Sequence, residues 1–529
     1  MTTTTPTANP TRQVRRAQAR QSQPAPAQSL AGEIIAQGTA KDAAATAAAT
    51  VTQAALTDAE LQAWRADFEA RWQTLQQHPE QNLGHIEEAV AASAKEPLRL
   101  LTQRAAQAKA NATPCRCPEC HQELTDQRFL SRGLDSRFGA FVIWRRYGRC
   151  PECKTWCFPA DYALGLGKKA PASPYLQEIC GLLVTKMPPE QAVAVAQRLG
   201  LDLSRCVLHR EAHRQGLKAQ ARRAQTVAQL ESWEGLQQLA RDPEGPPTQP
   251  FTLVIEIDAW NIRERDDWGQ TQTLREQGKK VERWHWVYMA TVFRLDHRGQ
   301  TAGERAVISQ RGYVATRLGL EALLPQLYRE AIQRGLGQTQ DVLVIADGAV
   351  WIWNLAKARF PAARQQLDLW HAEEHLWAVA HDLHGRGTSE ARAWVAPLLQ
   401  QVRDDQTTAV IATLDELKPR LTEAEAKKLQ TQIEYFEHHA PRMKYKDIIV
   451  ARKAVDKGQA TPEQSKLANQ PLGSGAIEST CRQYQCRFKR TGQFWTTAGD
   501  EALMCLETFW RNGRWHELYP HAKANLGLN

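Results

Sequence analysis

Two short cysteine motifs place the strongest constraint on what this chain can fold into. Cys117-Pro-Glu-Cys120 and Cys150-Pro-Glu-Cys153 share one sequence and are separated by residues 121–149. Each tight turn presents two thiolates, and a structural Zn²⁺ ion takes four such ligands in a tetrahedron. The spacer exceeds the usual spacing of about 15–20 residues between such pairs. Buried or redox-active thiols are the alternative, but the two motifs together predict a closed, structural zinc site.

The surroundings of these motifs favour a zinc ribbon. Between them, Phe141–Arg149 alternates apolar and polar residues as a ribbon strand does. Cys115 and Cys157 flank the motifs and could displace one of the four ligands. We therefore expect residues 112–160 to form a zinc-ribbon-like module.

Composition excludes several classes of protein. The chain has 529 residues, enough for several domains. Hydrophobic residues make up 42% and charged residues 24% of it, which excludes a wholly disordered protein. No stretch approaches the roughly 20 apolar residues of a membrane-spanning helix, so an integral membrane protein is not expected. The net charge of +9 favours polyanionic partners.

Cysteine usage and the N-terminus indicate the compartment. Eleven cysteines in so long a chain indicate reduced thiols rather than a secreted disulfide framework. The N-terminus has no apolar stretch of the kind that secretory signals carry. It contains Arg12, Arg15, Arg16 and Arg20 and no acid, which resembles a transit peptide but fits a basic disordered tail better. We expect a cytoplasmic protein.

Changes in composition and periodicity divide the chain into segments. A Pro-rich stretch at 241–250 marks the main boundary. We expect a disordered basic tail (1–30), a helical N-terminal region (31–111), the zinc-ribbon-like module (112–160), a second helical region (171–240), the first part of an α/β domain (251–385), an all-helical insertion (386–470), and the final part of the α/β domain with C-terminal helices (471–529).

The second helical region contains a candidate helix–turn–helix. Pro189–Arg198 has helical spacing, Leu199-Gly200-Leu201 is a turn, and Ser204 is a candidate cap for a helix over Ser204–Gln215. A pair of helices joined by a short Gly-containing turn is the geometry that reads a DNA major groove. An ordinary helical hairpin is the alternative. The candidate DNA contacts on the second helix are Arg205, His209, Arg210 and Arg214.

Strand and helix patterns alternate after the Pro-rich boundary. This order predicts a mixed sheet covered by helices, an α/β domain. The expected strands are Thr252–Asp258, Trp284–Leu295, Arg305–Val314, Asp341–Ala346 and Arg364–Leu369, and the expected helices are Leu318–Arg334, Val350–Arg359 and His371–Leu383.

Three carboxylates stand at prominent places in this domain. Asp258 ends an expected strand, Asp347 follows another, and Glu478 lies in the first turn of a helix expected from Ala476. Converging carboxylates repel one another unless cations neutralise them, and hard oxygen ligands suit Mg²⁺ or Mn²⁺. Two such ions can activate an attacking oxygen and stabilise a leaving oxygen at a phosphodiester. Solvated acids at strand ends are the alternative.

The sequence around these acids carries a resemblance. The stretches IEIDAW (255–260), IADGAVWIWN (345–354), LDLWHAEEHLW (367–377) and GSGAIESTCRQYQCRFKRTGQFW (473–495) follow one another in this order. Together they resemble bacterial insertion-sequence transposases of the DDE class, the Kra-type group related to Mutator-like transposases. The resemblance covers residues 112–515. It implies an RNase H-like catalytic domain, interrupted by a helical insertion between the second Asp and the final Glu.

The resemblance also implies roles for particular residues. Asp258, Asp347 and Glu478 would be the catalytic acids, holding two Mg²⁺ (or Mn²⁺) ions. Asp368 and His371 would form an auxiliary D-x-x-H element, although a plain helix-start histidine is an equal alternative for His371. The rivals for the third acid are Glu373 and Glu374, and Glu256, Asp266 and Asp267 are weaker rivals.

The activity implied is metal-dependent phosphodiester hydrolysis at element ends, followed by strand transfer into target DNA. The partners implied are double-stranded DNA, both terminal repeats and target, and further copies of the chain in a bacterial, nucleoid-associated setting. Alternatives are a nuclease of the same fold without strand transfer, a non-catalytic zinc-containing DNA-binding protein, and a zinc-stabilised protein-binding scaffold. Basic residues follow Glu478 and are placed to hold a phosphate backbone. A solvated helix face is the alternative. These residues are Arg482, Arg487, Lys489 and Arg490.

Overall fold

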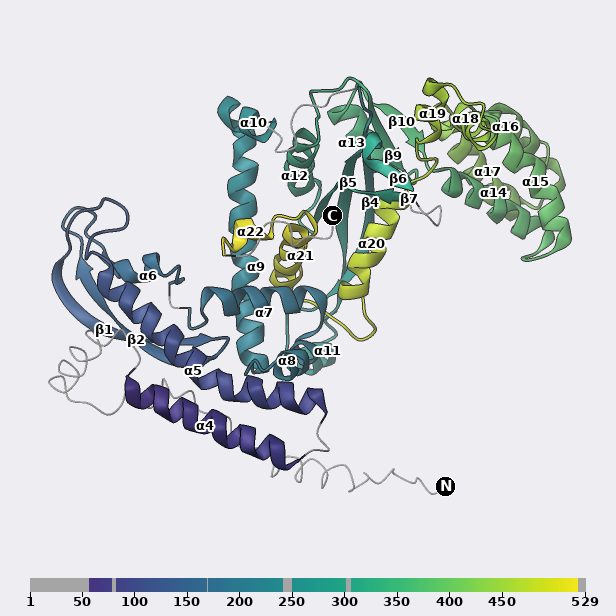
Figure 1. Cartoon of the computed structure of the whole chain (residues 1–529). Helices are drawn as coiled ribbons and strands as arrows, with labels where there is room; N and C mark the ends of the chain where they lie inside the picture. Colours follow the sequence, from purple (N-terminus) through teal and green to yellow (C-terminus); the bar gives the residue numbers. More distant parts are fainter. Residues whose placement is uncertain (1–56, 79–81, 169, 241–249, 301–305, 522–529) are drawn as a thin grey trace. The chain divides into compact units, whose positions relative to one another are not determined.

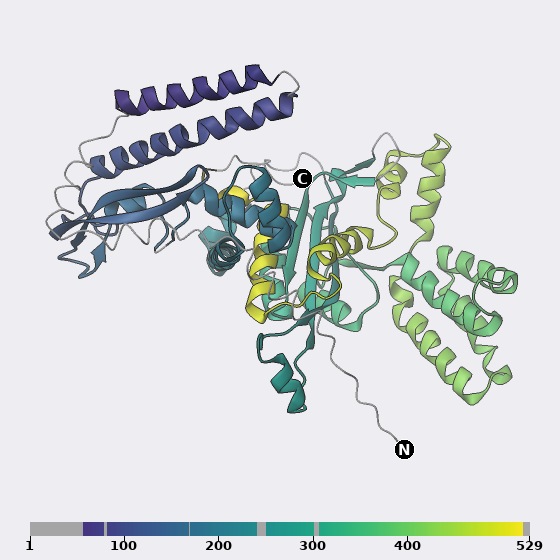
Figure 2. The same ribbon diagram turned by 90° about the horizontal axis from the view of Figure 1, so that it is seen from below.

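The computed structural model describes residues 57–78, 82–168, 170–240, 250–300 and 306–521 (Figures 1 and 2). The chain divides into two compact units. One comprises Met1–Gln177 with Ala196–Asp202, and the other comprises Glu178–Val195 with Leu203–Asn529. The predicted tail at 1–30 and most of the Pro-rich boundary lie outside the described residues. Among the described helices, none combines the length and apolar character that crossing a bilayer requires.

The first unit combines a helical hairpin with a small antiparallel sheet. Helix α4 spans Asp58–Gln77 and helix α5 spans Leu83–Ala112. The sheet has the order β1-β2-β3, with β1 at Thr125–Ser136, β2 at Gly139–Arg149 and β3 at Trp156–Cys157. The short helix α6, Pro159–Ala163, follows. The ribbon strand predicted at Phe141–Arg149 is confirmed by β2.

Helix α5 covers the free edge of β2 with two glutamines. Gln103 donates to the carbonyl of Val142 at 3.0 Å, and Gln107 donates to the carbonyl of Trp144 at 2.8 Å. The Trp144 N–H in turn donates to the Gln107 side chain at 2.8 Å. Edge strands expose backbone groups that invite unwanted pairing, and these amides satisfy them.

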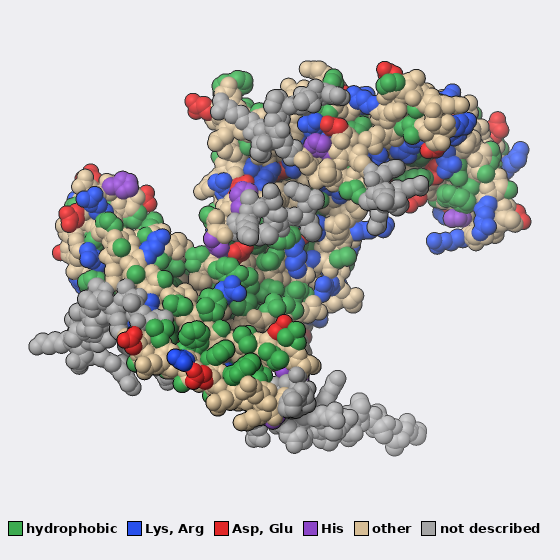
Figure 3. Space-filling view, in the orientation of Figure 1, with side chains coloured by type: hydrophobic (Ala, Val, Ile, Leu, Met, Phe, Trp, Pro, Cys, Tyr) green, Lys and Arg blue, Asp and Glu red, His purple; other side chains and the backbone are tan. Residues whose placement is uncertain are grey.

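Helix α4 leaves apolar side chains in solvent. Leu61, Trp64, Phe68 and Trp72 are all more than two-fifths exposed. Figure 3 shows green side chains gathered over α4 and α5 at the lower edge of the view. The spacing of three and four residues is helical, as the sequence predicted, but it does not place these residues in a core.

The second unit begins with helices. The helix–turn–helix candidate has both of its helices: α8 spans Pro189–Arg198, as predicted, and Ser204 caps α9 by accepting from the Val207 N–H. The prediction that the second helix ends at Gln215 is wrong, because α9 spans Arg205–Ala228. Its later turns continue as a packing helix, with Gly216 against Ala502 of α21 (Thr497–Arg511). The neighbouring helices are α7 (Pro174–Lys186) and α10 (Trp233–Ala240).

A five-stranded mixed sheet forms the centre of the second unit. Its order is β10-β9-β4-β5-β8. Strands β4, β5 and β8 are antiparallel neighbours, whereas β9 runs parallel to β4 and β10 runs parallel to β9. The bounds are β4 Leu253–Glu264, β5 Arg283–Arg294, β8 Arg311–Thr316, β9 Val342–Ala346 and β10 Arg364–Leu367, with a separate pair β6 Arg298–Gln300 and β7 Ala306–Ile308.

Two of the strand predictions need correction. The first strand does not end at Asp258, because β4 continues to Glu264 through its pairing with β5. The third strand of the sheet begins at Arg311, later than predicted, since Ala306–Ile308 pairs with β6 instead. The mixed α/β class is confirmed.

Helices cover both faces of this sheet. One face packs on α12 (Leu320–Gln333) and α13 (Val350–Arg359) through a core that includes Ile255, Ile257 and Leu323. The opposite face packs on α20 (Gly475–Phe488), where Ala476 lies against Val254 and Ile345. Alternate residues of β4 therefore enter opposite cores.

The segment expected to be an all-helical insertion, residues 386–470, is helical in the structure, and it extends the core of the first face. Buried residues such as Val395, Ile433 and Phe436 belong to the same cluster as the sheet residues (Figure 1, right). The helices from the end of β10 to α20 are α14 Leu369–His384, α15 Ser389–Arg403, α16 Thr407–Asp415, α17 Glu423–His439, α18 Lys446–Asp456 and α19 Pro462–Ala468. The remaining short helices are α11 Thr271–Glu276 and α22 Trp515–Leu518.

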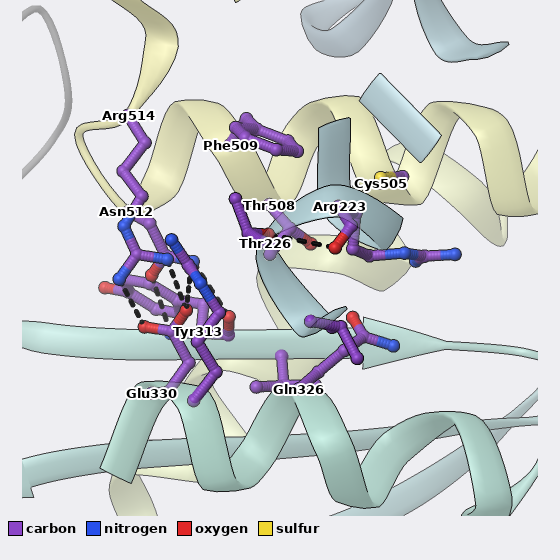
Figure 4. Close-up of a pocket in the computed structure, with 13 residues that line it drawn as sticks. Arg223, Thr226, Tyr313, Gln326, Glu330, Cys505, Thr508, Phe509, Asn512 and Arg514 are labelled. Carbon is purple, nitrogen blue, oxygen red and sulfur yellow. Dashed lines mark hydrogen bonds and ion pairs between the residues drawn. The ribbon is translucent and has the colours of Figure 1, made fainter. Parts of the chain in front are cut away.

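A buried ion cluster fastens the edge strand β8 to its helices (Figure 4). Asn512 pairs with both backbone groups of Tyr313, at 2.8 and 2.9 Å. Beside it, Glu330 of α12 accepts from Arg514 and Arg334. Burial opposes ionisation of Glu330, but these guanidinium groups outweigh it and lower its pKa to about 2. The cluster closes this edge of the sheet.

Candidate metal centres

The register of two parallel strands brings Asp258 and Asp347 together. Strand β4 pairs with β9 up to Glu256, which lies opposite Ile345. Two residues further along, Asp258 in β4 and Asp347 just after the end of β9 therefore lie opposite each other. Neighbouring strands lie about 4.8 Å apart, so the two acids are close neighbours although the sequence separates them widely.

The loop after β9 holds Asp347 in place. The Oδ1 atom of Asp347 accepts a hydrogen bond from the Ala349 N–H at 3.0 Å. Gly348 has a φ of 104°, a conformation that other residues rarely adopt. A side chain there would also meet Tyr435 at 3.1 Å. The glycine therefore serves both the turn and the close approach of the insertion helix α17.

Glu478 reaches the same place from the first turn of α20. The buried Glu256 anchors this turn by accepting from the Ile477 N–H at 2.7 Å. Burial raises the pKa of Glu256 to about 8, and the charges of Asp368 and Glu478 add to the effect. Glu256 shares the face of Asp258, as the two-residue period of a strand predicts. It positions the helix that carries Glu478.

Asp368 fixes the loop that leads into α20. Its carboxylate is fully buried and accepts from the Ser474 N–H at 2.5 Å and the Ser474 hydroxyl at 2.7 Å. It also caps α14 by accepting from the Trp370 and His371 N–H groups. Burial raises the pKa of Asp368, but the interaction with the His371 side chain and the hydrogen bonds from Ser474 outweigh it and leave the pKa below its ordinary value. Asp368 thus joins two separate segments of chain at the site.

His371 adds positive charge. Its Nδ1 lies 3.6 Å from the Asp368 carboxylate. Interaction with Asp368 raises the pKa of His371 to about 9, and the charge of Asp347 contributes. The imidazole is therefore protonated at neutral pH and offers a cation beside the acids.

Asp258, Asp347, His371 and Glu478 line one open cleft, whereas Glu256 and Asp368 lie behind its lining. Burial raises the pKa of Asp258, and the charges of Asp347 and Glu478 raise it further. This mutual repulsion is what a bound cation would relieve. The charged groups that line the cleft are Asp258, Asp347, His371, Glu374, Glu478 and Arg482.

The donor chemistry of this cleft fits a hard divalent cation. Asp258, Asp347 and Glu478 supply carboxylate oxygens, which Mg²⁺ prefers. Among the described residues, the tighter grouping is Asp368, His371 and Glu478, whose donor atoms lie within 4.8 Å of one another. Both Asp368 oxygens already accept hydrogen bonds, so we assign Asp368 to positioning. Asp258, Asp347 and Glu478 line one cleft, where the prediction would place two ions about 3.5–4 Å apart.

The predicted zinc site is assembled in the first unit. The sulfurs of Cys117, Cys120, Cys150 and Cys153 all lie within 4.8 Å of one another. Two of the separations are 3.9 Å (Cys117 to Cys153) and 3.4 Å (Cys120 to Cys150). A tetrahedral ion with bonds of about 2.3 Å separates its sulfurs by about 3.8 Å. The four thiols therefore form a group that could hold zinc.

The two turns share one backbone geometry. His121 and Lys154, which each follow the second cysteine of a motif, have φ values of 61° and 57°. N–H groups of Cys120 and Glu119 donate to the Cys117 sulfur and lower its pKa to about 7, which favours the thiolate that a metal binds. Cys115 and Cys157 pack beside the four, but among the described residues the cysteine sulfurs that lie within 4.8 Å of one another are those of the four CPEC cysteines. This geometry favours these four over the flanking pair.

Most of the predicted DNA contacts are accessible, with one correction. On α9, Arg205, His209 and Arg210 are exposed, and Arg214 is half-buried against Glu211. Arg482, Lys489 and Arg490 are exposed beyond Glu478. Arg487 is buried and donates to the Val184 carbonyl at 2.8 Å, so the prediction that it contacts DNA is wrong. Arg487 follows Tyr484 by three residues, which places both on the buried face of α20, and the sequence already contains this spacing.

Two of the rival acids are held in ion pairs, whereas Glu256 and Glu374 lie at the site. Glu373 pairs with Arg403 at 2.7 Å, and Asp266 pairs with Arg283 at 2.6 Å. Glu374 lines the cleft. The sequence did not single out Ser474 and Gly473 as site residues, yet both lie against Asp368: Ser474 donates to its carboxylate, and a Cβ on Gly473 would lie 2.6 Å from it.

A scan of the chain against protein-family models finds no match, and a search among curated proteins finds none either.

Proposed function

We propose that this protein is a DNA transposase of the DDE class, which cleaves element ends and joins them to target DNA. The observation that carries the proposal is the meeting of Asp258, Asp347 and Glu478 in one cleft from three separate segments. The mixed sheet, with an all-helical insertion between Asp347 and Glu478, supports an RNase H-like domain.

In this proposal, the residues at the site have separate roles in metal binding, positioning and phosphate binding. Asp258, Asp347 and Glu478 would hold two Mg²⁺ or Mn²⁺ ions, which when bound activate the attacking oxygen and stabilise the leaving oxygen. Asp368 and Glu256 orient the loop and helix that present Glu478. The protonated His371 and the exposed Arg482 offer positive charge to a phosphate.

Other parts of the chain support binding of element ends. The exposed cations of α9 suit contacts with DNA. The cysteine cluster would hold Zn²⁺ and so stabilise the β1–β2 ribbon. In this proposal a water opens the phosphodiester at the element end, and the resulting 3′-hydroxyl then attacks target DNA.

The test is incubation of the purified protein with DNA that flanks its own gene, with Mg²⁺ or with EDTA, followed by mapping of ends and joined products. Wild type is expected to cut at discrete element ends and to form joined products only with Mg²⁺. Asp347→Asn is expected to bind the same DNA and cut none of it. Cutting without joining would favour a nuclease, and an active Asp347→Asn protein would refute the site.

A further inference from the structure

A run of alternating aromatic rings and guanidinium groups lies on the second unit beyond the cleft. The guanidinium of Arg263 lies 5.5 Å from the ring centre of Trp284 and 4.8 Å from that of Phe494. The guanidinium of Arg265 lies 4.3 Å from Phe494 and 4.2 Å from Trp268. We call these five residues, in the order Trp284, Arg263, Phe494, Arg265, Trp268, the aromatic–arginine ladder.

Backbone pairing from three segments holds the ladder. Arg263 lies opposite Trp284 in the β4–β5 pair. The segment after α20 runs beside the end of β4, where the Arg265 N–H donates to the Trp495 carbonyl at 2.7 Å and the Trp495 N–H donates to Arg263 at 3.1 Å. The order is therefore fixed by secondary structure, and binding would not have to create it.

Exposure and charge distinguish the ladder from a core. Trp284 is 57% exposed and Trp268 is 52% exposed, although large aromatic side chains are costly in water. Among the described residues, no carboxylate forms an ion pair with Arg263 or Arg265. The nearby Asp266 carboxylate instead forms an ion pair with Arg283 and accepts a hydrogen bond from the Thr497 hydroxyl. The ladder thus offers uncompensated positive charge between open rings.

We propose that the aromatic–arginine ladder binds single-stranded DNA that leaves the cleft, with bases stacked on the tryptophans and phosphates held by the arginines. Rings of this kind stack on unpaired bases of any sequence, and a cationic groove follows the backbone. Arg263 lies five residues beyond Asp258 on β4, about 16 Å along the strand, and the odd separation places the two side chains on opposite faces of β4, so a DNA strand from the cleft would reach the ladder around the end of the sheet. The inference deepens the proposed function and rests on it.

Lys489 extends the ladder at the end nearer α20. Its ammonium lies 5.9 Å from the Trp284 ring and is exposed. Trp286, on the same face of β5 as Trp284, is also 51% exposed. By contrast, Trp260 and Trp353 are buried and pack in the core. Trp370 is 54% exposed and lines the cleft itself.

The test measures binding of fluorescent oligothymidine and of a duplex of equal length to the full-length protein in EDTA, where no cleavage occurs. The double variant Trp268→Ala/Trp284→Ala is expected to bind the single strand at least tenfold more weakly and the duplex nearly as wild type. The matched control is Trp233→Ala, which removes an exposed tryptophan of the same unit outside the ladder. Arg263→Gln/Arg265→Gln is expected to reduce the salt dependence of single-strand binding.

Each outcome decides the inference separately from the proposed function. Unchanged single-strand binding by both double variants overturns the inference, even if element ends are cut. If the ladder variants bind single-stranded DNA as wild type does but no longer self-associate in sedimentation, the inference is overturned in favour of an interface between copies of the chain. If the ladder variants lose single-strand binding while wild type never cuts element ends with Mg²⁺, the inference stands and the transposase proposal fails.

Discussion

Ser474 holds Asp368 with two hydrogen bonds to one oxygen: its backbone N–H and its hydroxyl both donate to Asp368 Oδ2, at 2.5 and 2.7 Å. These two hydrogen bonds, the Ser474–Asp368 bracket, link the start of α14 to the loop before α20. Because Glu478 lies one turn beyond Ser474, the bracket sets where that carboxylate reaches into the cleft. The site therefore depends on a loop as well as on the sheet.

The first prediction concerns the space within this bracket. A Cβ on Gly473 would lie 2.6 Å from the Asp368 carboxylate, so Gly473→Ala must displace the loop. Since an error of about 1 Å in a catalytic group can cost about 100-fold in rate, we expect Mg²⁺-dependent DNA cleavage to fall 10- to 100-fold. The measurement is the single-turnover cleavage rate.

The control is Gly475→Ala, two residues further on, where a Cβ meets nothing within 4 Å. It is expected to cleave within about twofold of wild type. Equal rates in the two alanine variants would show that the bracket does not position the site.

The second prediction identifies the third acid. Glu478→Gln removes a charge from the cleft while keeping the shape of the side chain, so we expect it to abolish metal-dependent cleavage and to leave DNA binding intact. Glu373→Gln is the comparison, because Glu373 pairs with Arg403 outside the cleft lining. Cleavage rates and filter binding, measured on the same DNA, separate the two. Loss of activity in Glu373→Gln alone would reverse the assignment.

The third prediction concerns zinc. The four CPEC thiols meet within 4.8 Å, so the purified protein is expected to carry one zinc per chain by elemental analysis. Cys120→Ser removes one of four ligands and should lower both the zinc content and the melting temperature of the first unit. Cys206→Ser, which alters an exposed cysteine away from the cluster, should change neither. A Cys120→Ser protein with full zinc and unchanged melting would contradict the site.

Local sequence predicted much of the architecture. The CPEC spacing is enough to form each turn, and Val350–Arg359 forms a helix with the predicted bounds because its pattern and its flanking residues are local signals. The candidate acids were also identified in advance, but their meeting depends on the β4–β9 register, which no local pattern states.

The errors have one physical origin, which is pairing between distant segments. Strand β4 passes Asp258 because β5 continues to pair with it, although the apolar run that predicted the strand stops there. Helix α9 passes Gln215 because α21 buries its later turns. Arg487 is buried because it faces the distant Val184 carbonyl, a contact that its positive charge does not predict. Ser474 and Gly473 act through Asp368, far away in sequence.

The last prediction concerns the ion cluster at the edge of the sheet. Glu330 is buried among Arg514, Arg334 and Arg329, and Glu330→Gln would remove the carboxylate that pairs with all three, leaving Arg329 and Arg514 the longer ion pairs with Glu517 at 3.9 and 4.0 Å. Breaking a buried ion pair in this way costs about 3–5 kcal/mol, so we expect a clear fall in the urea midpoint of the second unit at pH 7. Glu321→Gln, on the exposed side of α12, is expected to leave the midpoint unchanged.

The pH dependence follows from the same carboxylate. The folded state lowers the pKa of Glu330 from 4.5 to about 2, so its contribution to stability is fully present above the unfolded value and is lost as the pH falls towards the folded one. The difference in unfolding free energy between wild type and Glu330→Gln should therefore be constant from about pH 7 to pH 5.5 and shrink below about pH 4.5. Urea titrations of both proteins at intervals between these values provide the measurement. A difference that grows on acidification would mean that Glu330 is protonated in the folded protein and that the cluster in Figure 4 is held by other contacts.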